Sequence, residues 1–161
     1  MSSEGIDVAP GHNDGIPRIS VLFVCTHNSA RSIMAEALLR EKGGDAYEVF
    51  SAGTEPSQVR PLTLEVLREA GLPTAGLRSQ SVQEFMGRRF DYVITVCDSA
   101  RQDCPVFPGE GERFHWGYDD PSAVEGTDEE RLAAFRRVFT AISQRLDLFM
   151  NATARGAGQR T

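Results

Sequence analysis

The sequence predicts an α/β fold in which a parallel sheet lies between two layers of helices. Short apolar runs rich in β-branched and aromatic residues alternate along the chain with longer segments whose apolar residues recur at helical spacing. Strands that are separated by helices run parallel and are covered on both faces, which gives a three-layer architecture. The length of 161 residues is that of a single domain.

The first half of the chain contains two predicted strands and two predicted helices. The apolar run 19–24 is typical of a buried strand, and a helix is predicted over 31–42, where two successive glycines end it. A second strand is predicted at 47–50. The segment 61–70 begins with proline and is followed by glycine, as is typical of a helix.

The second half continues the alternation and closes with the clearest helix. Residues 92–96 predict a third strand, and the alternating segment 113–118 predicts a fourth. Thr127 and Glu130 form a capping-box pair that begins the last helix. Its apolar residues recur at steps of three and four: Leu132, Phe135, Phe139, Ile142, Leu146 and Phe149.

Both ends of the chain lack apolar periodicity. Residues 1–17 are rich in glycine and small polar residues, so we expect a flexible N-terminal arm. Residues 151–161 have the same character and predict a flexible C-terminal tail. We expect a single α/β domain to span residues 18–150.

Charge and cysteine content limit the partners and the location. The net charge is −6, whereas a nucleic-acid-binding face is basic, so we expect no nucleic acid. There is no apolar run of membrane-spanning length and no basic, apolar start typical of a signal peptide, so we expect a cytoplasmic protein without a membrane partner. Cysteines stay reduced there, and three is an odd number, which argues against a structural disulfide framework.

Cys25 stands at the end of the first strand, where a parallel sheet binds its ligands. The loop from Thr26 to Ser32 joins that strand to a helix, and such a loop can turn its backbone N–H groups around a tetrahedral oxyanion. Arg31 lies at the rim, where its guanidinium can hold two oxyanion oxygens. The same positive field is expected to lower the pKa of Cys25. The alternative is that Cys25 is a small buried hydrophobic residue that closes the strand.

The other loop residues have distinct expected roles. Ser32 is placed to donate a hydrogen bond to the sulfur of Cys25. Asn28 suits a left-handed backbone conformation, His27 is expected to contribute its backbone rather than act as a base, and Thr26 is expected to fill space. The predicted substrate-binding residues are Thr26, His27, Asn28, Ser29, Ala30, Arg31 and Ser32.

Cys97 follows the third strand, and Cys104 comes seven residues later. The residues between them suit a short helix, which would separate the two α-carbons by about 10.5 Å, whereas a disulfide requires about 4.4 to 6.8 Å. Because so short a helix is marginally stable, we expect residues 97–104 to form a redox segment that unwinds on oxidation. The alternatives are two unrelated cysteines or a zinc site, for which the spacing is unusual and His115 is the only imidazole candidate.

Asp120 lies next to Pro121 in a loop after the fourth predicted strand. A carboxyl group at this place can give a proton to, or take one from, a ligand in the anion site. The alternative is an ordinary surface turn.

Together these segments resemble the low-molecular-weight protein tyrosine phosphatase superfamily and, within it, the thioredoxin-coupled arsenate reductases. The similarity runs from about residue 19 to residue 149 and implies four parallel strands flanked by helices. One departure is Ala30, where many relatives have a further cysteine that is not one of the three relay sulfurs. The motifs are Val21-Leu22-Phe23-Val24-Cys25 with the loop to Ser32, Met34-Ala35-Glu36, Ser51-Ala52-Gly53-Thr54, Val96-Cys97-Asp98 to Cys104-Pro105, and Asp119-Asp120-Pro121.

The resemblance implies reduction of arsenate to arsenite, in arsenic detoxification, by a relay of three thiols. Thioredoxin is the implied reductant, with a low-molecular-weight thiol as the alternative, and we expect a monomer. The implied roles are nucleophile for Cys25, oxyanion arginine for Arg31, thiolate-stabilising serine for Ser32, relay cysteines for Cys97 and Cys104, and proton-handling aspartate for Asp120.

The resemblance implies no cofactor other than a potassium ion, which some relatives bind near the loop. The residues of this chain leave potassium binding undecided. Asn28, Glu36 and Ser51 match part of the potassium site of some relatives. Gln80 stands near the place where an acidic ligand is expected.

Two other functions remain open at this point. A protein tyrosine phosphatase needs the same loop and Asp120, but ester hydrolysis transfers no electrons and leaves Cys97 and Cys104 without a role. The loop also lacks the aromatic side chains that a phosphotyrosine ring favours, so we expect phosphatase activity only as a weak side reaction. A non-catalytic arsenite or redox sensor would use the three thiols and leave Arg31 idle.

Overall fold

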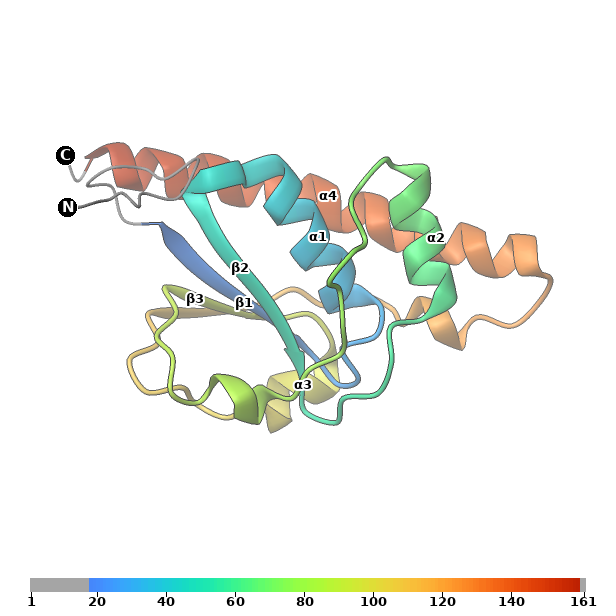
Figure 1. The fold of residues 1–161 in the computed structure, drawn as a ribbon, viewed down its shortest axis with the longest axis horizontal. Coiled ribbons are helices and arrows are strands. Elements are labelled where there is room, and N and C mark those ends of the chain that lie inside the picture. The colour runs from blue at the N-terminus through green and yellow to red at the C-terminus, as the bar shows by residue number, and fades with distance from the viewer. Residues whose placement is uncertain (1–17, 160–161) are drawn as a thin grey trace, which may run out of the picture.

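The computed structural model describes residues 18–159, with side chains placed through residue 153. Four parallel strands form one sheet in the order β2-β1-β3-β4 (Figure 1). This confirms the predicted four-stranded parallel sheet. The strands are β1 (Ile19–Cys25), β2 (Tyr47–Gly53), β3 (Tyr92–Thr95) and β4 (Glu112–His115).

Helices connect the strands and cover both faces of the sheet. In Figure 1, α1, α2 and α4 lie on one side of the sheet and α3 lies on the other. The α-helices are α1 (Arg31–Gly43), α2 (Pro61–Glu69), α3 (Asp98–Asp103) and α4 (Asp128–Gln159), and the 3-10 helices are η2 (Gly44–Ala46), η3 (Val82–Phe85) and η4 (Pro121–Ala123).

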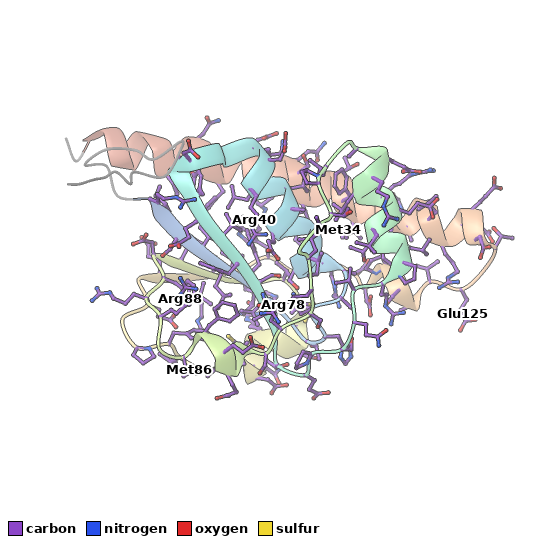
Figure 2. The ribbon with its side chains drawn as sticks, in the orientation of Figure 1. Met34, Arg40, Arg78, Met86, Arg88 and Glu125 are labelled. Atoms are coloured by element: carbon purple, nitrogen blue, oxygen red, sulfur yellow. The ribbon has the colours of Figure 1, made fainter. Side chains whose placement is uncertain are left out.

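Aromatic contacts on β2 show how the two faces are packed. The ring of Tyr47 lies 6.1 Å from that of Phe149 in α4. Phe50 is an odd number of residues further along the strand and therefore points to the other face. Its ring lies 5.5 Å from that of Phe85 in η3, and the guanidinium of Arg88 lies 4.3 Å above it (Figure 2).

The centre of the sheet is β1, whose residues 21–24 are fully buried. β2 pairs with one edge of β1, and β3, which comes later in the chain, pairs with the other edge. The carboxyl end of β1 is therefore the point where the strand order reverses, which is where open parallel sheets bind ligands. Cys25 is the last residue of this strand.

The last helix is longer than the sequence pattern indicates. Its capping box is confirmed, because Thr127 and Glu130 exchange hydrogen bonds between side chain and backbone N–H at 2.8 and 3.1 Å. The helix continues past residue 150 to Gln159, so the expectation of a flexible tail was wrong for 151–159. The physical reason is a buried contact between the hydroxyls of Thr153 and Tyr47, which anchors the extension to β2.

The structure covers neither the expected N-terminal arm nor the last two residues of the expected C-terminal tail. Residues 1–17 and residues 160–161 lie outside the described residues. Within residues 18–159, no helix is both long and apolar enough to cross a lipid bilayer.

Candidate active site

The loop between β1 and α1 forms a ring of backbone donors at the start of a helix. Asn28 has a φ of 50°, which confirms its predicted left-handed conformation. Within the described part of the chain, the backbone N–H groups of residues 27–31 donate no hydrogen bond to another protein atom. Free N–H groups in a curled loop at a helix N-terminus suit an oxyanion.

Arg31 is the first residue of α1 and is largely buried, with 12% of its side chain exposed. Its Nη1 donates a hydrogen bond to the carbonyl oxygen of Tyr118 at 2.9 Å, and its Nη2 lies 3.8 Å from Asp120 Oδ2. Its Nε is buried and has no partner. A buried guanidinium N–H without an acceptor is costly, so this free donor points to a bound anion.

Other side chains hold the loop through its carbonyl groups. His27 is exposed, its Nδ1 lies 3.0 Å from the carbonyl oxygen of Glu55, and its own carbonyl accepts from Ser79 Oγ at 2.8 Å. The carbonyl of Ser29 accepts a hydrogen bond from Thr63 Oγ1 at 2.9 Å. These contacts agree with a backbone role for His27 and leave its ring away from the nucleophile.

Gly53, at the end of β2, allows the loop to approach the sheet closely. A Cβ atom at this position would lie 2.7 Å from the carbonyl oxygen of Thr26 and 3.0 Å from the backbone nitrogen of Asn28. Any larger residue would therefore displace the loop.

Ser32 does not make the expected contact with Cys25. Its buried hydroxyl accepts a hydrogen bond from Asn28 Nδ2 at 2.8 Å, and the same amide donates to Ser51 Oγ at 2.9 Å. No hydrogen bond joins Ser32 to Cys25 in this structure, in which both residues are described. The hydroxyl accepts from the Asn28 amide and keeps its own proton, so it remains able to donate.

The residues that could hold potassium are already bonded to one another. Ser51 Oγ donates to Glu36 Oε1 at 2.5 Å, and Arg40 Nη1 lies 2.5 Å from Glu36 Oε2. The backbone N–H of Gln80 donates to Asn28 Oδ1 at 2.7 Å. The oxygens that would face a cation accept from protein donors, and Arg40 supplies a positive charge. These residues do not fit a potassium site.

The structure brings Cys97 against Cys25. The N–H and the hydroxyl of Thr26, the residue next to Cys25, each lie 3.2 Å from Cys97 Sγ. The two thiols are close enough to shift each other's pKa. The expectation that Thr26 only fills space was wrong, because β1 and β3 are neighbours and end side by side. Cys25 and Cys97 are buried together, at 3% and 4% exposure.

The two thiols titrate as a coupled pair, and their interaction moves the two pKa values in opposite directions. The hydrogen bond from Cys25 lowers the pKa of Cys97 to about 5, against the effect of burial. The hydroxyl of Thr26, the backbone N–H of Ala100 and the charge of Arg31 also lower the pKa of Cys97.

The same contact raises the pKa of Cys25 above its ordinary value. The hydrogen bond to Cys97 and burial outweigh the lowering effects of Arg31 and the Thr26 N–H. The expected low pKa of Cys25 was therefore wrong for the free protein. A second sulfur in contact stabilises the protonated form of the first, because two adjacent thiolates repel each other.

The predicted helix between the other two cysteines is confirmed. Cys97 immediately precedes α3 and Cys104 immediately follows it. Cys104 is 8% exposed, and burial raises the pKa of its thiol although the charge of Arg113 lowers it. At 1.5 Å per residue the helix separates the two α-carbons by about 10 Å, so a disulfide between them requires α3 to unwind.

Asp120 lies at the rim of the loop beside Arg31. Its Oδ1 accepts hydrogen bonds from the N–H and the hydroxyl of Ser122 at 2.9 and 2.7 Å. Burial raises the pKa of Asp120, but the Ser122 hydrogen bonds and the charges of Arg31 and Arg60 outweigh it and lower the pKa. The carboxylate is ionised in the free protein and is ready to accept a proton.

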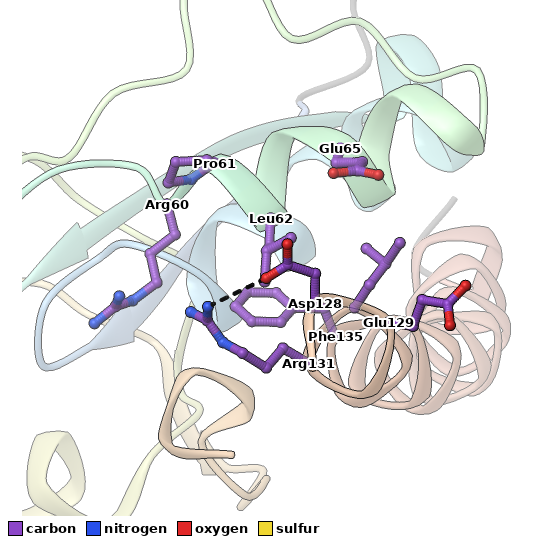
Figure 3. Close-up of a pocket in the computed structure, with 9 residues that line it drawn as sticks. Arg60, Pro61, Leu62, Glu65, Asp128, Glu129, Arg131 and Phe135 are labelled. Atoms are coloured by element: carbon purple, nitrogen blue, oxygen red, sulfur yellow. Dashed lines mark ion pairs between the residues drawn. The ribbon is translucent and has the colours of Figure 1, made fainter. Parts of the chain in front are cut away.

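A separate cavity of about 430 Å³ lies between the beginnings of α2 and α4 (Figure 3). Apolar side chains of Leu62, Leu132 and Phe135 line it, and an ion pair between Asp128 and Arg131 spans 4.0 Å beside them. None of the cysteines lines this cavity. The thiol arrangement at the end of β1 is thus a different site.

Comparison with known proteins places the chain in a family. Residues 20–158 match the family described as low molecular weight phosphotyrosine protein phosphatase. The chain belongs to this family. An arsenate reductase of Halalkalibacterium halodurans is 40% identical to this chain over 129 residues, which are 80% of this chain and 93% of that protein.

Solved structures agree with this family assignment. An arsenate reductase from Archaeoglobus fulgidus is 31% identical with a TM-score of 0.65, and the match covers 81% of this chain and 98% of that one. A thioredoxin-dependent arsenate reductase of Corynebacterium glutamicum is 29% identical with a TM-score of 0.63, and the match covers 86% of this chain and 65% of that one. The resemblance inferred from the motifs is confirmed.

Proposed function

We propose that this protein reduces arsenate to arsenite by passing oxidation from Cys25 to Cys97 and then to Cys104. The observation that carries the proposal is the position of Cys97 at the anion loop, where its sulfur lies 3.2 Å from the N–H of Thr26, the residue next to Cys25. Hydrolysis of a phosphate ester needs one thiol at that loop, whereas reduction of the bound anion needs a second thiol that can attack the first. Relatives that bear the name arsenate reductase support the same function.

The first step joins arsenic to Cys25. The free N–H groups of the loop and Arg31 hold the tetrahedral anion, and the sulfur of Cys25 attacks arsenic. An S–As bond forms and an As–O bond breaks, and the proton of Cys25 leaves with that oxygen as water. Asp120 is ionised in the free protein, so it can take this proton and pass it on. Arsenic stays pentavalent in this step.

The second step transfers two electrons. Cys97 has a pKa of about 5 and is therefore a thiolate at neutral pH. It attacks the sulfur of Cys25, an S–S bond forms, and the S–As bond breaks with its electron pair on arsenic, which leaves as arsenite.

The third step moves the disulfide out of the anion site. When α3 unwinds, Cys104 gives up its proton and its sulfur attacks Cys97. A Cys97–Cys104 bond forms, the Cys25–Cys97 bond breaks, and Cys25 is released and takes up a proton. No electrons are gained or lost by the protein in this exchange.

An external reductant must then supply two electrons. The chain contains three cysteines and the relay uses all of them, so the reducing dithiol comes from another molecule. We propose thioredoxin, since the C. glutamicum relative is thioredoxin-dependent. Val106, two residues after Cys104, is 75% exposed and offers an apolar contact next to the disulfide.

A coupled assay tests the proposal. NADPH oxidation is followed with thioredoxin, thioredoxin reductase and arsenate for wild type, Cys97→Ser and Cys104→Ser. Wild type should oxidise NADPH continuously, Cys104→Ser should release arsenite for one round only, and Cys97→Ser should release none. A phosphatase would hydrolyse p-nitrophenyl phosphate without arsenate-dependent NADPH oxidation, and a sensor would turn over neither compound; either result overturns the proposal. Turnover with a low-molecular-weight thiol but not with thioredoxin would overturn the choice of reductant alone.

A further inference from the structure

Two side chains of β4 hold the two ends of the redox segment, residues 97–104. Arg113 and His115 are two residues apart in this strand and therefore point to the same side. We propose that both are positioning residues for the thiol relay: His115 holds the end that stays in place, and Arg113 holds the end that is released on oxidation. This inference rests on the proposed relay.

His115 links the residues on either side of Cys97. Its Nδ1 lies 2.8 Å from Thr95 Oγ1 and its Nε2 lies 2.9 Å from Asp98 Oδ1. Thr95 is the last residue of β3 and Asp98 is the first of α3, so one ring joins the strand before the cysteine to the helix after it. The link fixes Cys97 where Thr26 can reach its sulfur. Both ring nitrogens are engaged, which removes the imidazole candidate for a zinc site.

Arg113 holds the backbone beyond the other end of α3. Its Nη1 donates to the carbonyl oxygen of Cys104 at 3.3 Å, and its Nη2 donates to that of Pro105 at 2.6 Å. Glu110 orients the guanidinium by accepting from Nε at 3.0 Å and from Nη2 at 2.8 Å, and it also accepts from the N–H of Phe107 at 2.9 Å. Because the guanidinium is rigid and its stem is anchored in the sheet, this backbone cannot move without breaking these bonds.

Formation of the disulfide moves the two ends unequally. The sulfur of Cys97 already lies 3.2 Å from the N–H and the hydroxyl of Thr26, the residue next to Cys25, so its end is in place before oxidation. Cys104 starts at the far end of α3 and must approach from about 10 Å to disulfide distance. The bonds of His115 can therefore persist in both redox states, whereas those of Arg113 to the backbone of Cys104 exist only in the reduced state.

The first test measures the equilibrium between the two redox states. In the Cys25→Ser background only the two thiols of the redox segment remain, and each disulfide formed passes two electrons and two protons to oxidised dithiothreitol. Arg113→Gln should raise the equilibrium constant for oxidation about two- to tenfold, because it removes hydrogen bonds of the reduced state alone. His115→Leu should leave the constant within about twofold. Arg101→Gln, in the last turn of α3, removes an exposed guanidinium for which the described residues show no side-chain hydrogen bond, and it is the matched control.

The second test measures the rate of arsenite release in a single turnover of the three-cysteine protein. His115→Leu should slow release about two- to tenfold, because Cys97 is no longer held against Cys25. His115→Gln, whose amide can still reach Asp98, should restore part of the rate. Arg113→Gln should leave the rate within about twofold, because Cys104 acts only after arsenite has left. Hydrolysis of p-nitrophenyl phosphate, which uses the anion loop and Asp120 but neither Cys97 nor Cys104, should be unchanged in all three variants and shows that the site is folded.

The inference predicts that each variant affects one measurement only: Arg113→Gln shifts the disulfide equilibrium, and His115→Leu slows arsenite release. Equal shifts of the disulfide equilibrium by Arg113→Gln and His115→Leu would overturn it, as would no shift by either or an equal shift by Arg101→Gln. If Arg113→Gln disturbs folding, Arg113→Lys, which keeps the charge but not the planar fork, takes its place with the same expected direction. A wild type that releases no arsenite contradicts the proposed function, while the disulfide equilibrium still decides the roles of the two side chains.

Discussion

The hydroxyl of Thr26 lowers the pKa of Cys97, so removing it tests the charge state of this thiol. Thr26→Val removes this hydroxyl, which lies 3.2 Å from Cys97 Sγ, and keeps a side chain of similar shape and the backbone N–H that lies 3.2 Å from the same sulfur. A thiolate at position 97 accepts from the hydroxyl, so its loss should raise the pKa of Cys97 from about 5.

The size of the effect follows from the strength of one hydrogen bond to a charged group. Such a bond contributes about 1.5 to 3 kcal/mol, and one pKa unit corresponds to about 1.4 kcal/mol. The pKa of Cys97 should therefore rise by about one to two units. The thiolate fraction would then fall about two- to tenfold near pH 6 and by less than about a fifth near pH 8.

Two assays read this change. Thiolate absorbance in the ultraviolet gives the titration curve, and arsenite release in a single turnover gives the rate at each pH. In both, the midpoint for Thr26→Val should move to higher pH, while Thr26→Ser, which keeps the hydroxyl, should stay near wild type. Superimposable pH profiles for wild type and Thr26→Val would refute the role assigned to this hydroxyl.

Three further predictions concern the anion site and the core. Arg31→Lys should lower kcat/KM for arsenate about 100-fold or more in the coupled assay, because a point charge cannot replace the planar guanidinium at a tetrahedral oxyanion; a loss below about fivefold would contradict the site. The pKa of Asp120 is lowered by folding, so its carboxylate stabilises the folded state above the ordinary aspartate pKa, and this contribution is lost as the pH falls through the lowered value. Urea unfolding at several pH values should show that Asp120→Asn is less stable than wild type near neutrality and that the difference vanishes in acid; a difference independent of pH would count against the ion pair. Leu146→Ala, at a fully buried position of α4, should cost about 2 to 5 kcal/mol of unfolding free energy, whereas Leu148→Ala, at a 67% exposed position, should cost less than about 0.5 kcal/mol; equal losses would contradict the packing of this helix.

The elements of the fold follow from local patterns in the chain. Apolar runs, helical spacing and the capping pair of Thr127 and Glu130 located the four strands and the main helices. The continuation of α4 beyond residue 150 escaped this reasoning, because it depends on Tyr47, a residue more than 100 positions away whose hydroxyl meets Thr153. A contact of that kind leaves no periodic signal in the sequence.

The anion loop was also predictable, because its chemistry comes from consecutive residues. The left-handed conformation of Asn28 and the free N–H groups after it are local properties of one turn. The contacts of Thr26 and Ser32 were not predictable in this way, since each depends on a residue from another strand or on the inward turn of the Asn28 amide.

The charge state of the thiols was the largest departure from expectation. Sequence spacing shows a helix N-terminus and Arg31 next to Cys25, and both favour a thiolate there. It does not show that Cys97 lies beside Cys25, where the interaction of the two thiols raises the pKa of Cys25 and lowers that of Cys97. Only the order of strands in the sheet brings the two cysteines together.

The fate of the three sulfurs in one turnover tests the relay most directly. Reduced wild-type protein is mixed with excess arsenate and no reductant, arsenite is counted, and disulfides are mapped by mass spectrometry of unreduced peptides. The relay predicts one arsenite per chain, a bond between Cys97 and Cys104, and a free thiol at Cys25. Arsenite produced without that bond, or a protein that leaves arsenate unchanged with all three thiols free, would contradict it.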